Sequence, residues 1–220
     1  RQVDDRIADG ASGVKLRRLR RLSIGVYAVI ASRLLLPLWA ELQKAHPDLE
    51  IDLHTSSNPL DLLPGRFDAV IIVSDAAPRA GLITRRLIPI STVPVCAPHW
   101  LKRGPPDFAK VPLLHARPRP DDWRRWLDHA GFKSVPVQGG SSFQSMGLAI
   151  QAAAAGVGFA IAIKELPPVD LARRKLVIAH PTGRQTRRHF VLQYEARLAD
   201  EPALAAFADW ITKRLSTALS

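Results

Sequence analysis

The stretch from residue 22 to residue 53 constrains the fold more than any other, because its apolar pattern changes period twice. Residues 22–26 form a short apolar run with β-branched members, which is typical of a buried strand. Leucines then recur at helical spacing over residues 34–42 and predict one apolar helix face. The helix should stop at His46-Pro47, since a residue before proline avoids the helical region, and residues 49–53 alternate as a half-buried strand does. A helix between two strands predicts a parallel pair, with a ligand-binding loop at the carboxyl end of the first strand.

The rest of the chain continues with short strands and helices and shows no internal repeat. Further strands are predicted at residues 69–73, 82–90, 92–97, 113–115, 135–137, 159–163, 176–178 and 190–194. Helices are predicted at residues 58–65, from Asp121 or Asp122 to Gly131, from Ser142 to Gly156, at residues 170–172 and at residues 202–215. The pattern therefore predicts two similar α/β halves joined by two crossing strands.

Composition predicts a globular chain of ordinary polarity. Of 220 residues, 47% are hydrophobic and 23% charged. The single cysteine, Cys96, excludes an internal disulfide and fits a reducing compartment. Arg33 and Pro37 interrupt the one apolar run that could resemble a signal or membrane segment. We therefore expect a cytoplasmic protein without a membrane partner.

The formal net charge of +11 leaves two interpretations open. Basic residues are dense in the first 21 positions and scattered elsewhere, as at Arg85-Arg86, Arg124-Arg125 and Arg187-Arg188. They form either a solvated basic surface or a surface that assists DNA contact by an attached module. Direct nucleic-acid binding would favour a continuous basic face with stacking aromatic side chains, which the sequence does not predict.

Motifs for catalysis are missing from the sequence. Gly156-Val157-Gly158 follows a predicted helix and has Ile161 in place of a third glycine, so it is no dinucleotide fingerprint. There is no phosphate loop and no G-x-S-x-G elbow. The seven histidines lack metal-ligand spacing. We expect neither an enzyme nor a bound metal or cofactor.

Three local features carry a family resemblance: a strand that reaches Gly25, the helix start Ala31-x-x-Leu-Leu-Leu-Pro37, and the turn His46-Pro47-Asp48. With them the chain resembles the effector-binding domain of LysR-type transcriptional regulators, in the branch of glycine-cleavage activators and β-lactamase regulators. The resemblance runs from about Leu22 to Trp210. It implies an α/β, bilobed fold like that of type 2 periplasmic binding proteins, with two Rossmann-like subdomains joined by two crossing strands.

The resemblance also implies a division of the chain. Residues 1–21 would end a linker from a DNA-binding domain that is absent here, residues 22–95 and 196–220 would form subdomain I, and residues 96–195 subdomain II. The hinges are expected near 93–97 and 194–197. The first helix would pair with the edge strand of a second copy to give a homodimer, with a tetramer in the full-length protein. The expected dimer residues are Leu35, Leu38, Trp39, Leu42 and Ile51.

An effector is expected in the cleft between the lobes, where strand ends and two helix starts meet. The candidate residues are Val29, Ile30, Ser32, Thr55, Ser56, Ser57, Ser74, Asp75, Ser142, Phe143, Ser145, Met146 and Tyr194. Hydroxyls and free N–H groups there suit a carboxylate or phosphate, although several of these serines could simply cap helices or turns.

The cleft departs from the family at three places. Val29 stands where Ser or Thr is common, Ile72 where Arg is common, and Gln144-Ser145-Met146 where the second-lobe helix often opens with Asp-Asp-Ser. All three changes remove polarity, so an effector that is anionic, as the helix starts favour, should also be partly apolar, or tight effector binding has been lost. The main hypothesis is the ligand-sensing domain of a transcription regulator; the alternatives are a periplasmic solute-binding protein and an enzyme on the same fold.

Overall fold

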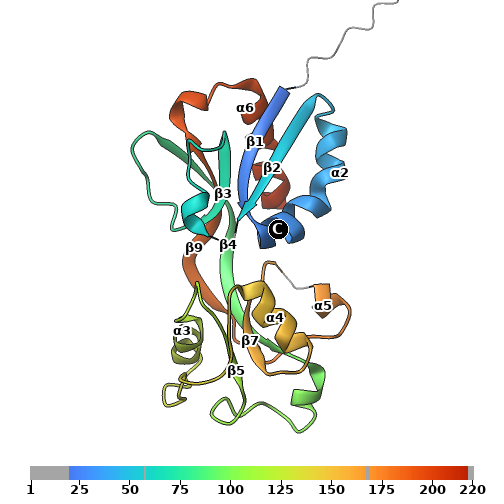
Figure 1. The fold of residues 1–220 in the computed structure, drawn as a ribbon, viewed down its shortest axis with the longest axis vertical. Coiled ribbons are helices and arrows are strands. Elements are labelled where there is room, and N and C mark those ends of the chain that lie inside the picture. The colour runs from blue at the N-terminus through green and yellow to red at the C-terminus, as the bar shows by residue number, and fades with distance from the viewer. Residues whose placement is uncertain (1–19, 57, 167–168, 218–220) are drawn as a thin grey trace, which may run out of the picture.

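The computed structural model of the chain describes residues 20–56, 58–166 and 169–217, which form two lobes joined by two long strands (Figure 1). In this part of the chain one nine-stranded sheet runs in the order β2-β1-β3-β9-β4-β7-β5-β6, with β8 paired to β4. The strands are β1 Arg20–Tyr27, β2 Leu49–Ser56, β3 Ala69–Ser74, β4 Leu82–Cys96, β5 Leu113–Ala116, β6 Ser142–Phe143, β7 Phe159–Ile163, β8 Val177–Ile178 and β9 Arg184–Glu195. The helices are α1 Ala28–Ile30, α2 Leu36–Ala45, α3 Asp122–His129, α4 Met146–Ala154, α5 Val169–Ala172 and α6 Pro202–Thr217. Short 3₁₀ turns lie at Pro59–Asp61, Pro98–Leu101 and Ala196–Leu198.

The strand–helix–strand unit of the first lobe forms as the sequence predicts. β1 and β2 are parallel, with Leu22 opposite Ile51. Between them α1 and α2 are joined by a π-helical segment, Ala31–Leu35. Pro37 lacks an N–H and so cannot donate to the carbonyl of Arg33, and the wider turn directly before it accommodates that missing bond. The helix ends at His46, whose N–H donates to Leu42 O at 2.8 Å.

The first-lobe core is mainly aliphatic. Leu22, Ile24 and Val26 alternate into it from β1, and each is at most 2% exposed. They pack in one cluster with leucines of α2 and with Leu204, Phe207 and Ile211 of α6. Both helices therefore hold the end of β1, and with it the first loop of the cleft, in place.

One long strand replaces two predicted segments. We predicted separate strands at 82–90 and 92–97, but β4 is continuous over 15 residues. Its register against β9 shifts between Arg86 and Ile88 and again between Pro89 and Ser91, so the irregularities that suggested a break are bulges instead. β4 and β9 run antiparallel from the first lobe into the second (Figure 1).

The second lobe places side chains on both faces of a smaller sheet. Ala160 and Ala162 of β7 face a cluster that includes α4, whereas Phe159 and Ile161 face a cluster that includes Trp123 and Trp126 of α3. This alternation is the one expected of a strand covered on both sides. The lobe is thus a three-layer α/β unit, and α4 presents its first turn toward the first lobe.

Two predictions for the second lobe are wrong. Residues 135–137 form no strand, because Val135 O accepts a bond from Arg124 Nη1 at 3.0 Å and Val135 N donates back to Phe132 O, so its backbone is used in a turn. Ser142 does not begin a helix either. Ser142 and Phe143 form β6, parallel to β5, and α4 starts only at Met146.

The limits of the lobes stay a prediction at residue level. Phe190, Leu192 and Tyr194 of β9 pack in the first-lobe core, while Arg184 lies opposite Thr92 where β4 begins to pair with β7. The expected linker at residues 1–21 falls almost wholly outside the described residues. No helix in the described part of the chain is long and apolar enough to cross a membrane.

Candidate functional site

A cavity of about 460 Å³ lies between the lobes, within the range of small-molecule sites. It is lined from the first lobe by Tyr27, Ala28, Val29, Ile30, Ser32, Arg33, Ser56 and Val73, from the second lobe by Ala116, Pro118, Arg119, Ser145, Met146, Gly147, Gln151 and Ile163, and from β9 by Arg188 and Phe190. The cavity therefore touches both lobes and one of the strands that join them.

The first-lobe side of the cavity is built from the carboxyl end of β1. Tyr27 is the last residue of that strand, and the chain turns directly into α1 with no side chain capping the helix start. Ile30 and Val29 both line the cavity; Ile30 is fully buried, whereas Val29 is half-buried. Arg33 reaches from the π-helical segment to the second lobe, where its Nη1 donates to Leu166 O at 3.5 Å.

The serines around the cavity are engaged within the protein. Ser145 Oγ accepts a bond from Leu148 N at 3.2 Å and caps α4. Ser56 Oγ donates to Asp61 Oδ2 at 2.7 Å and accepts from Asn58 N at 3.0 Å. Ser32 Oγ donates to Val29 O at 3.3 Å. Of these three serines, Ser56 and Ser32 donate their hydroxyl protons within the protein, whereas Ser145 only accepts, so its hydroxyl can still donate to a ligand.

Charge in the cavity is of one sign. Arg33, Arg119 and Arg188 contribute to its wall, and the described wall contains no Asp or Glu. Burial raises the pKa of Tyr27, and the positive charges of Arg188 and then Arg119 act in the opposite direction. The Tyr27 hydroxyl therefore stays protonated at neutral pH and lies within electrostatic reach of two arginines.

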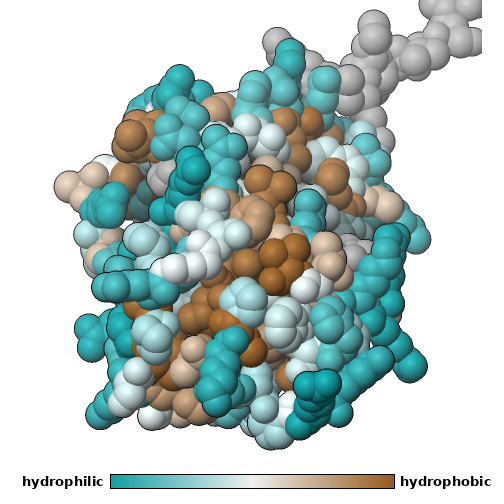
Figure 2. Space-filling model, turned by 60° about the horizontal axis from the view of Figure 1, so that its bottom comes forward, coloured by the Kyte–Doolittle hydropathy of each residue, from teal (hydrophilic) through white to brown (hydrophobic). Residues whose placement is uncertain are grey.

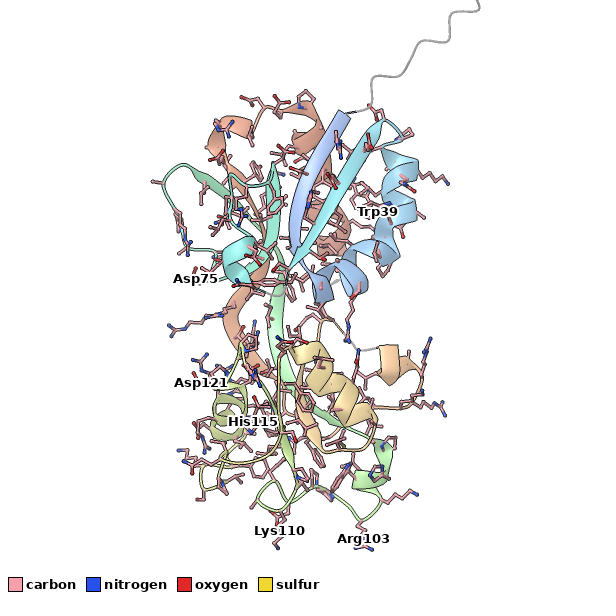
Figure 3. All side chains as sticks on the ribbon, in the orientation of Figure 1. Trp39, Asp75, Arg103, Lys110, His115 and Asp121 are labelled. Carbon is pink, nitrogen blue, oxygen red and sulfur yellow. The ribbon has the colours of Figure 1, made fainter. Side chains whose placement is uncertain are left out.

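Six predicted effector residues come together in the wall, namely Val29, Ile30, Ser32, Ser56, Ser145 and Met146. Thr55, Ser74 and Asp75 do not line it; Asp75 accepts from Ala77 N in a local turn, and Figure 3 shows it on the side of the first lobe away from α2. Ser142 borders a shallower hollow beside His115, and Phe143 packs on the second-lobe core. Tyr194 is 2% exposed, and its hydroxyl accepts from Arg85 Nε. Ser57 lies outside the described residues.

The predicted dimer residues divide into two groups. Leu35 and Leu42 are buried in the first-lobe core of their own chain. Leu38, Trp39 and Ile51 are half-buried, and Trp39 lies on α2 at the outer edge of the first lobe (Figure 3). β2 is the edge strand of the sheet, so α2 and β2 together form one flank of the molecule. Figure 2 shows apolar surface gathered near the middle of one face, among predominantly hydrophilic side chains.

Sequence reasoning missed Tyr27, Arg119 and Arg188. Tyr27 ends β1 and Arg119 comes three residues after β5, so both lie at the carboxyl end of a strand, which is the rule that located the other candidates. Arg188 had been treated as part of a scattered basic surface. Only the crossing of β9 beneath both lobes brings it to the cavity.

Comparison with known proteins gives the family. The sequence profile described as LysR substrate binding domain matches residues 17–216. The HTH-type transcriptional regulator TrpI of Pseudomonas aeruginosa is 30% identical over 200 residues, which cover 88% of this chain and 67% of that protein. The glycine cleavage system transcriptional activator of Escherichia coli K12 is 26% identical over 195 residues, covering 86% of this chain and 63% of that protein.

Solved structures show the same fold. The effector domain of the regulator AmpR of Pseudomonas aeruginosa superposes with a TM-score of 0.79 at 24% identity, covering 90% of this chain and 96% of that one. The AmpR effector-binding domain of Citrobacter freundii gives a TM-score of 0.77 at 23% identity, covering 90% and 98%. These relatives are transcriptional regulators, which favours the regulator over the solute-binding protein among the functions considered. The chain belongs to the family of LysR substrate-binding domains, the effector-binding part of LysR-type transcriptional regulators.

Proposed function

We propose that this domain senses a small molecule in the cavity between its lobes and passes the binding event to an attached DNA-binding module. The observation that supports this most is the position of the cavity. Its wall is shared by β1, α4 and β9, so a ligand would contact both lobes and the strand between them. A ligand that binds one lobe orientation more tightly shifts the population toward it.

Transmission would run through a dimer formed by the flank of α2 and β2. Leu38, Trp39 and Ile51 are half-buried there, and Leu36 is 54% exposed. An edge strand and an apolar helix side give a surface that can pair with its own copy across a twofold axis. We further propose a cytoplasmic regulator that acts as a dimer or tetramer on DNA, with the basic surface assisting DNA contact.

Filling the cavity tests the proposed site. A Cβ added at Gly147 would meet only Ser145 Oγ within 4 Å, at 3.7 Å, and Gly147 lines the cavity, so Gly147→Phe should fold and place its ring in the cavity. Leu148→Phe is the matched control, because Leu148 is exposed on the same turn and does not line the cavity. In a thermal-shift screen of small acids, amides and amines, any compound that stabilises the wild type and Leu148→Phe should lose its effect on Gly147→Phe. Equal stabilisation of all three proteins would place the ligand elsewhere.

A further inference from the structure

The cavity carries an unbalanced positive charge. Arg119 and Arg188 approach it from different elements, one from the loop after β5 and the other from β9. Among the described lining residues no carboxylate faces them. Arg119 is half-buried and Arg188 is exposed, so solvent screens part of this charge, but a cavity lined by charges of one sign should still attract anions and disfavour cations.

Arg119 is held in a fixed orientation by a neighbouring carboxylate. Its Nε donates to Asp122 Oδ2 at 2.6 Å and its Nη2 to Asp122 Oδ1 at 3.1 Å. The side chains of Arg119 and Asp122 are only 21% and 12% exposed. A bidentate pair of this kind leaves Nη1 of the guanidinium available and aims it without further ordering cost.

The charge of Asp122 is shared with other cations, so Arg119 is not fully neutralised. Burial lowers the pKa of Arg184, as do the nearby charges of Arg125 and Arg119, while Asp122 raises it. Two carboxylates, Asp121 and Asp122, thus lie among three arginines at the start of α3. This edge of the cavity stays net positive.

Arg188 differs from Arg119 because its guanidinium has no ion-pair partner within residues 20–56, 58–166 and 169–217. Its backbone is nevertheless fixed, since its N–H donates to Thr186 Oγ1 at 3.1 Å and Thr186 donates to its carbonyl. The Tyr27 hydroxyl, which lines the same cavity, provides a further donor within electrostatic reach of Arg188. The two cationic groups and one hydroxyl come from the second lobe, β9 and the first lobe.

Most of the remaining wall is apolar. Val29, Ile30 and Val73 contribute from the first lobe, Met146 and Ile163 from the second, and Phe190 from β9. Ser32 and Ser56 are engaged in local bonds and offer little to a ligand. Arg33, Gln151 and Ser145 add further polar groups to the wall, so the cavity combines positive charge with a largely apolar surface.

We propose that the cavity binds a small anion with an apolar or aromatic body, a carboxylate or phosphate ester, whose charged group is held by Arg119 and Arg188 and whose body lies against Val29, Met146 and Phe190. This inference rests on the proposed sensing function and names its ligand class. The anion bridges the two lobes and the crossing strand. Recognition runs through guanidinium groups, in contrast to the serine-based site that the sequence suggested.

The test uses four probes on the same chain, namely phenylacetate, phenyl phosphate, the neutral isostere phenylacetamide and inorganic phosphate. Binding is measured by calorimetry at fixed ionic strength. Arg188→Gln removes the charge, and Arg187→Gln is the matched control, because Arg187 is an exposed neighbour on β9 that does not line the cavity. A double variant, Arg119→Gln with Asp122→Asn, removes the second guanidinium without leaving the Asp122 carboxylate unpaired.

We expect one of the two aromatic anions to bind several-fold more tightly than the amide, and Arg188→Gln to weaken it by about 3- to 10-fold, because the Arg188 side chain is exposed and solvent screens its charge. The carboxylate and phosphate arms show which head group fits, and inorganic phosphate shows whether the apolar body contributes. Arg187→Gln should bind as the wild type does.

Three results would overturn the inference: equal affinity for acid and amide, unchanged acid binding by Arg188→Gln, or no binding of either aromatic anion at about 10 mM. The outcome for the sensing function is read separately from Gly147→Phe. If the amide binds the wild type but not Gly147→Phe, the cavity is a ligand site of another class. If Gly147→Phe binds every probe unchanged, the proposed function fails as well.

Discussion

The two lobes share an α/β architecture but solve the problem of a core in different ways. The first lobe packs aliphatic side chains of β1, α2 and α6 in one large cluster. The second lobe divides into two smaller clusters, one on each face of its sheet. On the α3 face Phe108 contacts the rings of Trp123, Trp126, Phe132, Phe159 and His180, with centroids 5.2–6.3 Å apart. A small sheet with short helices reaches sufficient burial by using large, rigid rings.

This difference matters at the cavity, because each lobe fixes its own wall. Aliphatic packing holds Tyr27 and Val29 at the end of β1 in the first lobe. In the second lobe the aromatic cluster holds α3, and through Asp122 it holds Arg119. The position of Arg119 in the cavity wall thus depends on the aromatic packing of the second lobe, whereas the positions of Tyr27 and Val29 depend on the aliphatic core of the first lobe.

The largest expected effect comes from truncating one ring in each lobe. Phe108 and Phe207 are 2% and 1% exposed, and replacing either with alanine should cost about 3–5 kcal/mol of unfolding free energy. Three of the five tryptophans, Trp100, Trp123 and Trp126, belong to the second-lobe cluster, whereas Trp39 and Trp210 lie on first-lobe helices α2 and α6. Urea unfolding followed by fluorescence therefore reports on both lobes with more weight on the second, and circular dichroism also reports on both.

If the continuous sheet couples the lobes, both variants should show one transition, shifted alike in the two signals. Independent lobes would instead split the fluorescence transition of Phe207→Ala: the signal of Trp39 and Trp210 would shift to lower urea, and the larger signal of the second-lobe tryptophans would stay at the wild-type midpoint.

An intermediate loss of stability is expected where the Cβ of an alanine in place of glycine would meet a neighbouring atom. A Cβ at Gly140 would meet Leu113 O at 2.0 Å, at a φ of +83°, whereas a Cβ at Gly25 would meet the Phe67 ring at 2.5 Å. The second lobe would have to move backbone, and the first only a half-buried side chain. Gly140→Ala should therefore cost about 1–3 kcal/mol, more than Gly25→Ala.

Gly139→Ala is the control for this pair, since Gly139 has a φ of +94° with no atom within 4 Å of the added carbon. Its loss of stability measures the free-energy cost of the backbone conformation alone, without the clash that Gly140→Ala adds. Thermal unfolding of all three variants gives the order; a Gly140→Ala protein as stable as Gly139→Ala would show that the β5 edge yields easily.

The smallest expected effect compares the two helix starts that face the cavity. Ser145 caps α4 through Leu148 N, but no side chain caps α1 after Tyr27. Ser145→Ala should cost about 1 kcal/mol of stability, and Tyr27→Phe close to none. Calorimetric melting of both variants measures this difference, with Ser142→Ala as an exposed control. A cost for Tyr27→Phe equal to that for Ser145→Ala would mean that the hydroxyl has a structural partner.

Local pattern was enough to predict most elements. The apolar runs at residues 22–26, 69–73 and 159–163 became β1, β3 and β7, because a strand buried on its faces needs little besides apolar side chains. The pattern failed at residues 135–137, where the side chain of Arg124 takes the carbonyl that a strand partner would use. It failed again at β4, where prolines suggested a break and the structure has bulges.

The sequence predicted one part of the candidate site and missed another. Rules for strand ends and helix starts found Val29, Ser56 and Ser145, since these depend on neighbours in sequence. Arg188 depends on where β9 crosses, 69 residues beyond Arg119, and no local signal distinguishes it from its neighbour Arg187, since both are exposed. Which serines remain free for a ligand likewise depends on hydrogen bonds that spacing does not specify.

The continuity of β4 and β9 has a mechanical consequence. A hinge made of loops opens at little enthalpic cost, but here the joint is a hydrogen-bonded two-stranded ribbon with two register shifts. Reorienting the lobes means twisting that ribbon, and bulges are where added twist is most easily absorbed. The ribbon should therefore resist twisting elastically, so that the lobes rotate through a small angle and return to their first orientation when the ligand leaves. An anion bound to Arg188 would change the twist of the ribbon directly, because Arg188 lies in β9.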